Sequence, residues 1–482
     1  MISSIISAIG NNSSVYPLFV RDCLIEVPTK IYKTYKQNNS DDEIAYLATR
    51  EKLIDEYATS AVWLGGIPLI GRIANFAIKK RGFNPDVSLA LLKNEELLQK
   101  IDEQILSLKR SQLSNIDKIQ NLSKKRERIF AQSLSGNIEK FKNIKGAEKA
   151  INDLEKVKAN PKTYKNLLGA KFAAEMAIPI ALMGFIIPKI VFAITANTRR
   201  KKVELMQNKQ LKADTFSTQG NNIESFLKNS NQPTFGGSLG SGLTNLTTVQ
   251  KMAITDGGYA VGRVTTARKK SEAIDIAFKM AGMMYLNFVA PKQIEKLLNK
   301  ISKKTFNLNV DLDPKILADK NFLKQIRNSS LTLPKTDKLP DMLEFIDNPE
   351  NNKTLFVQYA EKLKKIKLIS DGSNGKIRDP RFFIEETKLA DLRNNMKSFA
   401  DEIKRAESSG LQGAKIEKSI KNILRKSKAL KTFNILANVG ISSYLLACAL
   451  PNMQYALRRR FLGTEFEPGL IDTPQNSKKS SR

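Results

Sequence analysis

The sequence predicts an all-α protein. It is expected to be a multi-helix chain with two to four apolar segments, membrane-associated or deeply buried, and a long amphipathic, coiled-coil-like helical arm. The first observation behind this prediction is the stretch Phe433 to Leu457, which contains no charged residue and is followed at once by Arg458, Arg459 and Arg460. Its length of roughly 25 residues is what an α-helix needs to cross ~30 Å of hydrocarbon.

The second observation is the spacing of apolar residues in the polar region from Leu89 to Ile129. Leu98, Ile101 and Ile105 recur at steps of three and four, which is typical of one face of a helix. The same register then passes through polar residues, and this pattern indicates a coiled coil or a helical hairpin with a polar middle. A second amphipathic helix is predicted from Asn137 to Ala159.

Three further apolar stretches differ in strength. Ala58 to Ile78 holds the only tryptophan, but Gly65-Gly66-Ile67-Pro68 in its middle predicts a helix interruption. Phe172 to Ala196 contains two charged residues. The uncharged part of Ile274 to Pro291 has only about a dozen residues, which is more typical of a core helix or an interfacial segment than of a span.

Basic residues flank the apolar segments, and positive residues prefer the cytosolic side of a membrane. A simple crossing would carry one basic flank of the second and of the last segment across the bilayer. We therefore predict hairpin insertion, with bends at Gly66-Ile67-Pro68, Pro179, Gly184 and Pro451, where irregular backbone must be buried in protein.

Three apolar stretches also end alike, as FIIPK near Pro188, FVAPK near Pro291 and CALPN near Pro451. Their spacing is irregular, so we interpret the shared pattern as a helix-end device rather than as a repeat.

Composition points to an anionic partner. The 482 residues include 79 Lys and Arg against 48 Asp and Glu, for a net charge of +31. This excess favours nucleic acid or the negatively charged leaflet of a membrane. A lysine-rich bacterial coding bias is the alternative explanation. The basic runs lie beside the apolar segments and aromatic residues make up only 7%, which favours a membrane surface over a base-stacking groove.

The absence of histidine excludes several kinds of catalytic and metal site. Without it the chain has no His-based acid–base catalysis, no Ser–His or Cys–His nucleophile pair and no His metal site. Cys23 and Cys448 are too few for a disulfide framework or a Cys-rich zinc site, and a reducing compartment is the simpler interpretation. The N-terminus has no basic residue before its short apolar stretch, so we expect no export signal and cytosolic basic portions.

Two glycine-containing motifs were considered as phosphate sites. Asp371 to Lys376, DGSNGK, lacks the hydroxyl residue and the preceding strand of a phosphate loop, and is predicted to be a plain turn. Thr255 to Arg263, TDGGYAVGR, is interpreted as a structural turn; an anion contact at the Gly257-Gly258 loop is the alternative, because adjacent glycines let the backbone approach a phosphate.

These features divide the chain into nine expected regions. They are the N-terminal amphipathic region 1–57, apolar segment 1 at 58–81, the helical arm 82–161, apolar segment 2 at 162–202, a flexible linker 203–250, the Gly loop with apolar segment 3 at 251–301, a soluble helical region 302–430, apolar segment 4 at 431–460, and a disordered tail 461–482.

The expected function is that of a non-enzymatic, membrane-associated structural or interaction protein. Its basic regions would lie on the cytoplasmic side against anionic lipid, and helix 89–129 would bind a protein partner or a second copy. The alternative is a soluble basic helical protein that binds nucleic acid or forms part of a larger assembly. An enzyme using scattered carboxylates is a third possibility without a recognisable motif; no catalytic residue, metal or cofactor is expected. The candidate anion or lipid contacts are Lys79, Lys80, Arg81, Arg199, Arg200, Lys201, Lys202, Arg263, Arg268, Lys269, Lys270, Arg458, Arg459 and Arg460.

Overall fold

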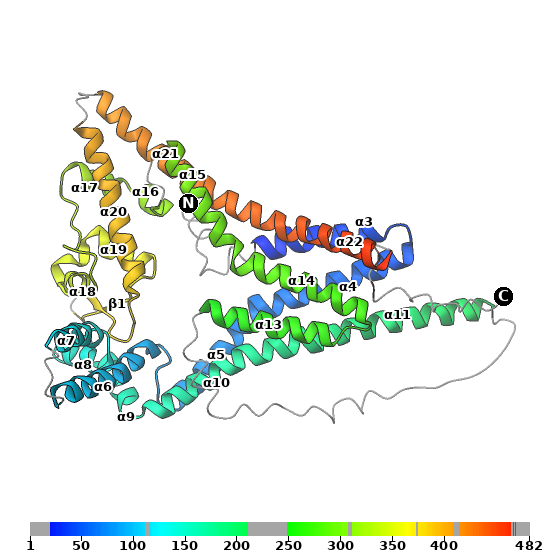
Figure 1. Ribbon diagram of the computed structural model, residues 1–482, viewed down its shortest axis with the longest axis horizontal. Coiled ribbons are helices and arrows are strands. Elements are labelled where there is room, and N and C mark those ends of the chain that lie inside the picture. Colours follow the sequence, from blue (N-terminus) through cyan, green and yellow to red (C-terminus); the bar gives the residue numbers. More distant parts are fainter. Residues whose placement is uncertain are drawn as a thin grey trace. The chain divides into compact units, whose positions relative to one another are not determined.

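The computed structural model describes residues 20–110, 116–210, 248–306, 311–372, 375–408, 414–463, 466 and 468. It is 82% helical with almost no strand, which confirms the predicted all-α class (Figure 1). Most of the expected linker, from residue 211 to 247, lies outside the described residues, as does most of the expected tail. The first residues of that linker continue a helix to Gln210.

The chain forms two compact units. The described residues of the first, here called the core unit, fall within Ile73–Leu168 and Ile294–Asn438. Those of the second, here called the apolar-helix unit, fall within Ser13–Arg72, Gly169–Gln293 and Val439–Arg482. The boundaries between the units lie inside the helices α5, α10, α15 and α21, whose ranges are given below.

The core unit is built from short helices and one small hairpin. Its elements are α6 (Leu89–Arg110), α7 (Ile116–Phe130), α8 (Leu134–Phe141), α9 (Glu148–Ala159), α16 (Pro314–Leu317), α17 (Lys320–Arg327), α18 (Leu339–Asp347), the 3-10 helix η5 (Pro349–Lys353), α19 (Leu355–Lys362), β1 (Leu368–Ser370), β2 (Lys376–Arg378) and α20 (Glu386–Glu407).

An ordinary apolar core holds α16 to α20 together. Phe322, Phe356 and Phe399 are fully buried in one cluster. The rings of Phe322 and Phe399 stack with centroids 6.0 Å apart, and Phe322 meets Tyr359 edge to face. Apolar burial is the main driving force for folding. The predicted helical region 302–430 contains these helices and, in addition, one β-hairpin.

The DGSNGK motif connects the two strands of that hairpin in the sequence. Leu368 pairs with Arg378 and Ser370 pairs with Lys376 across the antiparallel strands. The Asp371 carboxylate accepts a hydrogen bond from the Gly375 backbone N–H at 2.8 Å. A strand therefore precedes the motif, contrary to expectation, and the plain turn stays a prediction because Ser373 and Asn374 lie outside the described residues.

Two arginines connect the hairpin to the helices beside it. Arg378 is fully buried, donates to Asp347 at 2.8 Å and lies over the ring of Phe141 on α8. Arg381 donates to Asp153 on α9 and to Asp379. Burial alone would lower the pKa of Arg381, but its hydrogen bonds to these two carboxylates outweigh burial and raise that pKa.

The predicted helical arm is a helix pair that packs on its neighbours. α6 and α7 lie against each other, and Arg126 donates to Asp102 across them at 2.5 Å. α6 also buries four apolar residues and contacts α8. The single helix expected from Asn137 to Ala159 is wrong, because the chain forms α8 and α9 with a turn between them at Gly146, whose φ of +86° favours glycine.

The apolar-helix unit contains long helices that continue through π-helical turns. Its elements, some extending into the core unit, are η1 (Val20–Glu26), α3 (Val27–Asn38), α4 (Asp42–Ala61), η2 (Val62–Gly66), α5 (Ile67–Lys80), α10 (Pro161–Pro179), η3 (Ile180–Ile186), α11 (Ile187–Gln210), α13 (Thr248–Thr265), α14 (Lys270–Phe288), α15 (Ala290–Phe306), α21 (Ala414–Tyr444), η6 (Leu445–Ala449) and α22 (Leu450–Leu462).

Three of these helices are long and apolar enough to cross a membrane. They are Asp42–Lys80, Pro161–Arg200 and Lys415–Leu462, here called the first, second and third long helices. The hairpin prediction is wrong for them, since each runs on as one helix through the sites where bends were expected. α14 and α15 meet at a 41° bend before Pro291 and pass the same test as a broken pair, giving up to four candidate spans.

Each π-turn lies just before a proline. The backbone N–H groups of Ile67, Ile187 and Leu450, the residues before Pro68, Pro188 and Pro451, each donate to the carbonyl five residues earlier. Proline lacks an N–H and its ring clashes with the carbonyl four residues before it. A wider i→i−5 turn accommodates that clash without ending the helix. The interpretation of Pro188 and Pro451 as helix-end signals is therefore wrong, whereas a helix boundary does occur at Pro291.

Candidate functional site

The apolar-helix unit differs from the core unit in the proportion of polar side chains among those that it buries. Its buried side chains are polar as often as they are apolar, and they include Asp55, Asp275, Lys279 and Arg458. In the core unit buried apolar side chains outnumber buried polar ones several-fold. Buried charges are costly unless they are paired, so the interior of the apolar-helix unit has to be explained by its ion pairs.

The outer surface of the three long helices is correspondingly apolar. Only 6% of the most apolar 18-residue window of the first long helix is buried, against 28% in the second and 33% in the third. Leu69, Ile190 and Tyr444 are each at least half exposed. Large contiguous exposed apolar surfaces mark protein or membrane contact in folded proteins.

Close helix packing organises the unit around α13. The segment Thr255 to Arg263 lies wholly within this helix, so the expected structural turn is wrong. Its glycines let another helix approach: a Cβ placed on Gly262 would lie 2.8 Å from the Cα of Gly184 in η3, and one on Gly258 would lie 2.5 Å from Ile180. Gly258 and Gly262 have the i, i+4 spacing of small residues that brings helices into close contact.

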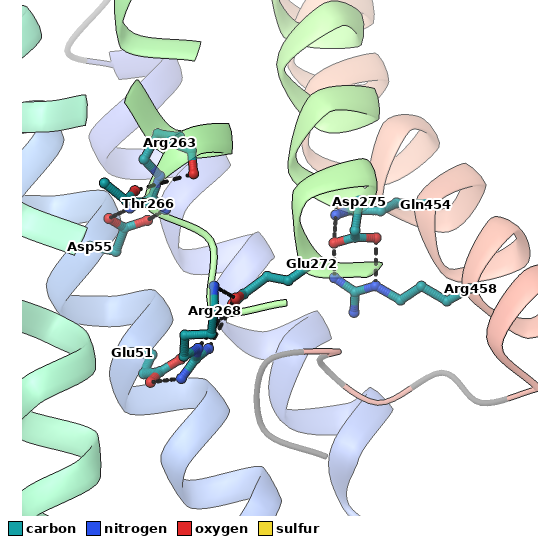
Figure 2. Close-up of polar contacts among 9 residues, drawn as sticks. All are labelled: Glu51, Asp55, Arg263, Thr266, Arg268, Glu272, Asp275, Gln454 and Arg458. Carbon is teal, nitrogen blue, oxygen red and sulfur yellow. Dashed lines mark hydrogen bonds and ion pairs between the residues drawn. The ribbon is translucent and has the colours of Figure 1, made fainter. Parts of the chain in front are cut away.

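Two arginines at the end of α13 and in the turn after it pair with α4 (Figure 2). Arg263 donates to both carboxylate oxygens of Asp55, at 2.7 and 2.5 Å. Arg268 lies between Glu51, at 3.0 Å, and Glu272, at 2.7 Å. Burial alone would lower the pKa of Arg268, but its bonds to these two carboxylates raise it.

A third arginine joins α22 to α14. Arg458 donates through two nitrogens to the Asp275 carboxylate, at 2.7 and 2.6 Å (Figure 2). Gln454, one turn earlier on the same helix, donates to Asp275 at 2.6 Å. All three residues are buried. Bidentate Arg–carboxylate pairs are among the strongest and most directional ionic contacts.

Lysines gather around one carboxylate at the meeting of α3, α4 and α14. Glu56 lies 2.9 Å from Lys279, 3.2 Å from Lys52 and 3.7 Å from Lys30. Lys30 also pairs with Glu26 one turn before it. This subset therefore holds three cations against two carboxylates.

Together these contacts, here called the ion-pair network, form separate groups on nearby turns of α4 and α14, with opposite charges equal in number. The balance is notable in a chain of net charge +31. Its six carboxylates are Glu26, Glu51, Asp55, Glu56, Glu272 and Asp275, and its six cations are Lys30, Lys52, Arg263, Arg268, Lys279 and Arg458.

The network lies toward one end of the long helices. The first and second long helices run antiparallel, because Arg50 donates to Thr198 while Gly71 lies against Glu175. Residues 51–56 therefore lie near the C-terminal end of the second long helix. Arg458 lies near the C-terminal end of the third. Paired charges near the end of an apolar helix are far less costly than charges at its middle.

The residues predicted to contact anions fall into two groups, one buried in ion pairs and one exposed. Arg263, Arg268 and Arg458 bind carboxylates inside the unit, so their charge is used for packing. Exposed side chains remain at Lys79, Lys80, Arg81, Arg200, Lys270, Arg459 and Arg460; Arg199 and Lys269 are partly exposed. The structure describes the backbone of Lys201 and Lys202 as helical and not their side chains.

Comparison with protein-family models, with curated proteins and with solved structures finds no match to this chain. Within the described residues, no group of three or more Cys, Asp or Glu side chains is placed to hold a metal ion.

Proposed function

We propose that this chain is a non-enzymatic integral membrane protein with a structural or interaction role. Its apolar helices would anchor the core unit at a membrane. The observation that supports this proposal most is the distribution of side chains in the apolar-helix unit, which buries paired charges and exposes apolar helix faces. Water favours the opposite arrangement. Hydrocarbon favours this one, since ionisable groups in membrane proteins face the bundle interior and pair with one another.

The proposed cytoplasmic side is the end of the bundle that carries Lys79, Lys80 and Arg81. These three side chains are exposed, as is Lys162 at the start of the second long helix. At the opposite end three arginines are buried against carboxylates and Arg200, Lys270, Arg459 and Arg460 are exposed, so the assignment depends on the lysine-rich flanks of the first and second long helices. Exposed Lys and Arg beside a span prefer the cytosol and contact anionic lipid.

The proposed protein partner binds the helix pair α6 and α7. Leu106 and Ile116, which approach the connection between these helices, are more than half exposed. Arg126 and Asp102 fix the two helices to each other. An exposed apolar pair on a packed helical hairpin offers a contact for another helix; a second copy of the chain and a different protein are both compatible with it.

Membrane extraction tests the proposal directly. We expect the full-length protein, expressed with its membranes intact, to stay in the pellet through high salt and through alkaline carbonate, because apolar burial in lipid depends on neither ionic strength nor pH. Detergent should release it. Release by salt alone would indicate a purely electrostatic surface contact, and the soluble nucleic-acid-binding alternative would then take precedence if the released protein bound DNA with a steep salt dependence.

Cysteine accessibility tests the crossing. On a background with Cys23→Ser and Cys448→Ala, we expect Lys80→Cys and Lys162→Cys to react with an impermeant thiol reagent only from the cytoplasmic side, and Arg200→Cys only from the other side. The antiparallel arrangement of the first and second long helices requires this split. Labelling of all three positions from the same side would contradict straight crossing and restore hairpin insertion.

A further inference from the structure

The helix α15 carries an unbalanced charge. Its sequence holds five lysines and one acidic residue, Glu295. The helix α20 of the core unit is a suitable comparison, because it holds five basic and five acidic residues. A lysine-rich coding bias would act on both helices alike, so the excess on α15 requires a local explanation.

The apolar residues of α15 are also exposed. Among the residues of this helix, all of which the structure describes, only Ala290 and Ser302 are buried. Leu297 and Ile301 are 59% and 50% exposed. The apolar residues of α20, such as Phe399, are instead buried in the core cluster. α15 therefore presents to its surroundings the kind of face that α20 buries.

Three kinds of residue follow separate rows along α15. Positions three or four apart lie on the same face of a helix. The rows are apolar at Ile294, Leu297 and Ile301, polar at Glu295, Asn299 and Ser302, and basic, with exposed side chains, at Lys292, Lys296, Lys300 and Lys304. Lys300 and Lys304 lie three positions after Leu297 and Ile301, so the lysine row borders the apolar row.

The polar row packs against α21 (Figure 1). Ser302 donates to the side-chain oxygen of Asn434 at 3.2 Å, and Asn434 donates to Asn299 at 3.1 Å. Glu295 lies 3.9 Å from Lys431, so the one acidic side chain of α15 faces α21. Asn434 is the second residue of the uncharged stretch of the third long helix, and Lys431 belongs to the basic flank before it. α15 therefore contacts this helix at the level where the helix would enter a membrane.

We propose that α15 binds the surface of an anionic bilayer, with Leu297 and Ile301 at the boundary between headgroups and acyl chains and the lysine row against lipid phosphates. Amphipathic helices with lysines beside an apolar face bind anionic membrane surfaces in this way. The charge favours lipid over a second copy of this basic chain, which would bring like charges together. This inference rests on the proposed membrane location and deepens it, because it assigns a lipid contact to a helix that was not among the residues predicted to contact anions.

Quenching by labelled lipids tests the contact in the full-length protein. On the background with Cys23→Ser and Cys448→Ala, a fluorophore is attached to Ile301→Cys or, in a separate sample, to Ile190→Cys. Both positions are at least half exposed, so a label there displaces no buried side chain. The protein is placed in nanodiscs of phosphatidylcholine alone or of phosphatidylcholine with phosphatidylglycerol. Each disc also contains a lipid that carries a nitroxide quencher, either just below the headgroup or deep in the acyl chain.

We expect the shallow nitroxide to quench the Ile301→Cys label at least about twofold more in anionic than in neutral discs. A lysine near an anionic surface strengthens binding about fivefold. Lys296→Gln with Lys300→Gln should therefore lower the ratio of bound to released α15 by about 25-fold and bring the quenching in anionic discs to the neutral level. Lys397→Gln with Lys404→Gln on α20 is the matched control, with the same change in net charge at exposed positions, and should leave the quenching unchanged.

Equal quenching in the two kinds of disc, or equal effects of the two double variants, would overturn the proposal. Protection of the Ile301→Cys label from aqueous iodide without quenching by lipid would mean that protein covers the apolar row, and would overturn it as well.

The Ile190→Cys label on the second long helix separates this inference from the proposed function. Quenching of that label by the deep nitroxide, with none at Ile301→Cys, would retain the membrane crossing and remove only the α15 contact. Absence of quenching at both positions would contradict both proposals.

Discussion

Replacing Asp275 by Leu is expected to destabilise the full-length protein in neutral detergent by about 3–5 kcal/mol, the usual cost of leaving one partner of a buried ion pair uncompensated. Asp275 accepts hydrogen bonds from two nitrogens of the buried Arg458 guanidinium, and Gln454 donates to it as well. Its loss leaves several buried donors facing an apolar side chain. Unfolding in a denaturing detergent, followed by circular dichroism, measures the effect.

The double variant Asp275→Leu with Arg458→Met distinguishes the cost of leaving one buried charge unpaired from the loss of the ion pair itself. Replacing both charges by apolar groups removes the desolvation cost together with the attraction, and buried pairs replaced in this way are often close to neutral in stability. We therefore expect the double variant to lie within about 1 kcal/mol of the parent, and Arg458→Met alone to be as harmful as Asp275→Leu alone.

An exposed pair provides the control for this cycle. Lys388 and Glu385 pair at 2.8 Å in the core unit with both side chains more than half exposed. Exposed pairs contribute little because water screens them. Substituting either or both should change stability by less than about 1 kcal/mol. A coupling between Asp275 and Arg458 as small as this would mean that the two groups are hydrated and not buried against each other.

The fold class could be predicted from the sequence because it depends on local patterns. Uncharged stretches such as Phe433 to Leu457 and the helical spacing around Leu98 and Ile101 are properties of neighbouring residues. The continuation of the long helices through proline was not predicted, because the rule that proline ends a helix describes an isolated helix. A π-turn that packs among other helices lets the helix continue along the same axis. Thr266, for example, lies 3.3 Å from the carbonyl of Gly184, which Pro188 cannot satisfy.

The ion-pair network could not be predicted, because its partners are far apart in the sequence. Arg263 and Asp55 are separated by 208 positions, and nothing local distinguishes this arginine from those on exposed flanks. One sequence signal was available for its surroundings. The i, i+4 spacing of Gly258 and Gly262 in a mostly apolar helix indicates close helix packing, but the adjacent Gly257-Gly258 pair was interpreted as a turn.

Gly262→Leu is expected to be the most harmful single substitution on α13. A Cβ at this position would lie 2.8 Å from the Cα of Gly184, and backbone cannot yield as a flexible side chain can. Overpacking of this kind costs about 1–3 kcal/mol and more where a backbone must move. The same measurement in neutral detergent should show the loss of stability.

Gly257→Ala is the matched control, since both glycines lie in the same helix and gain a side chain. The nearest atom to a Cβ at Gly257 is the Met284 methyl group at 3.9 Å, an ordinary contact. Alanine is also the better helix former by about 1 kcal/mol, so this variant should be as stable as the parent or slightly more stable. Equal stability of Gly257→Ala and Gly262→Leu would contradict the packing of α13 on η3 through Gly262. It would also contradict the position of the adjacent Arg263 against Asp55.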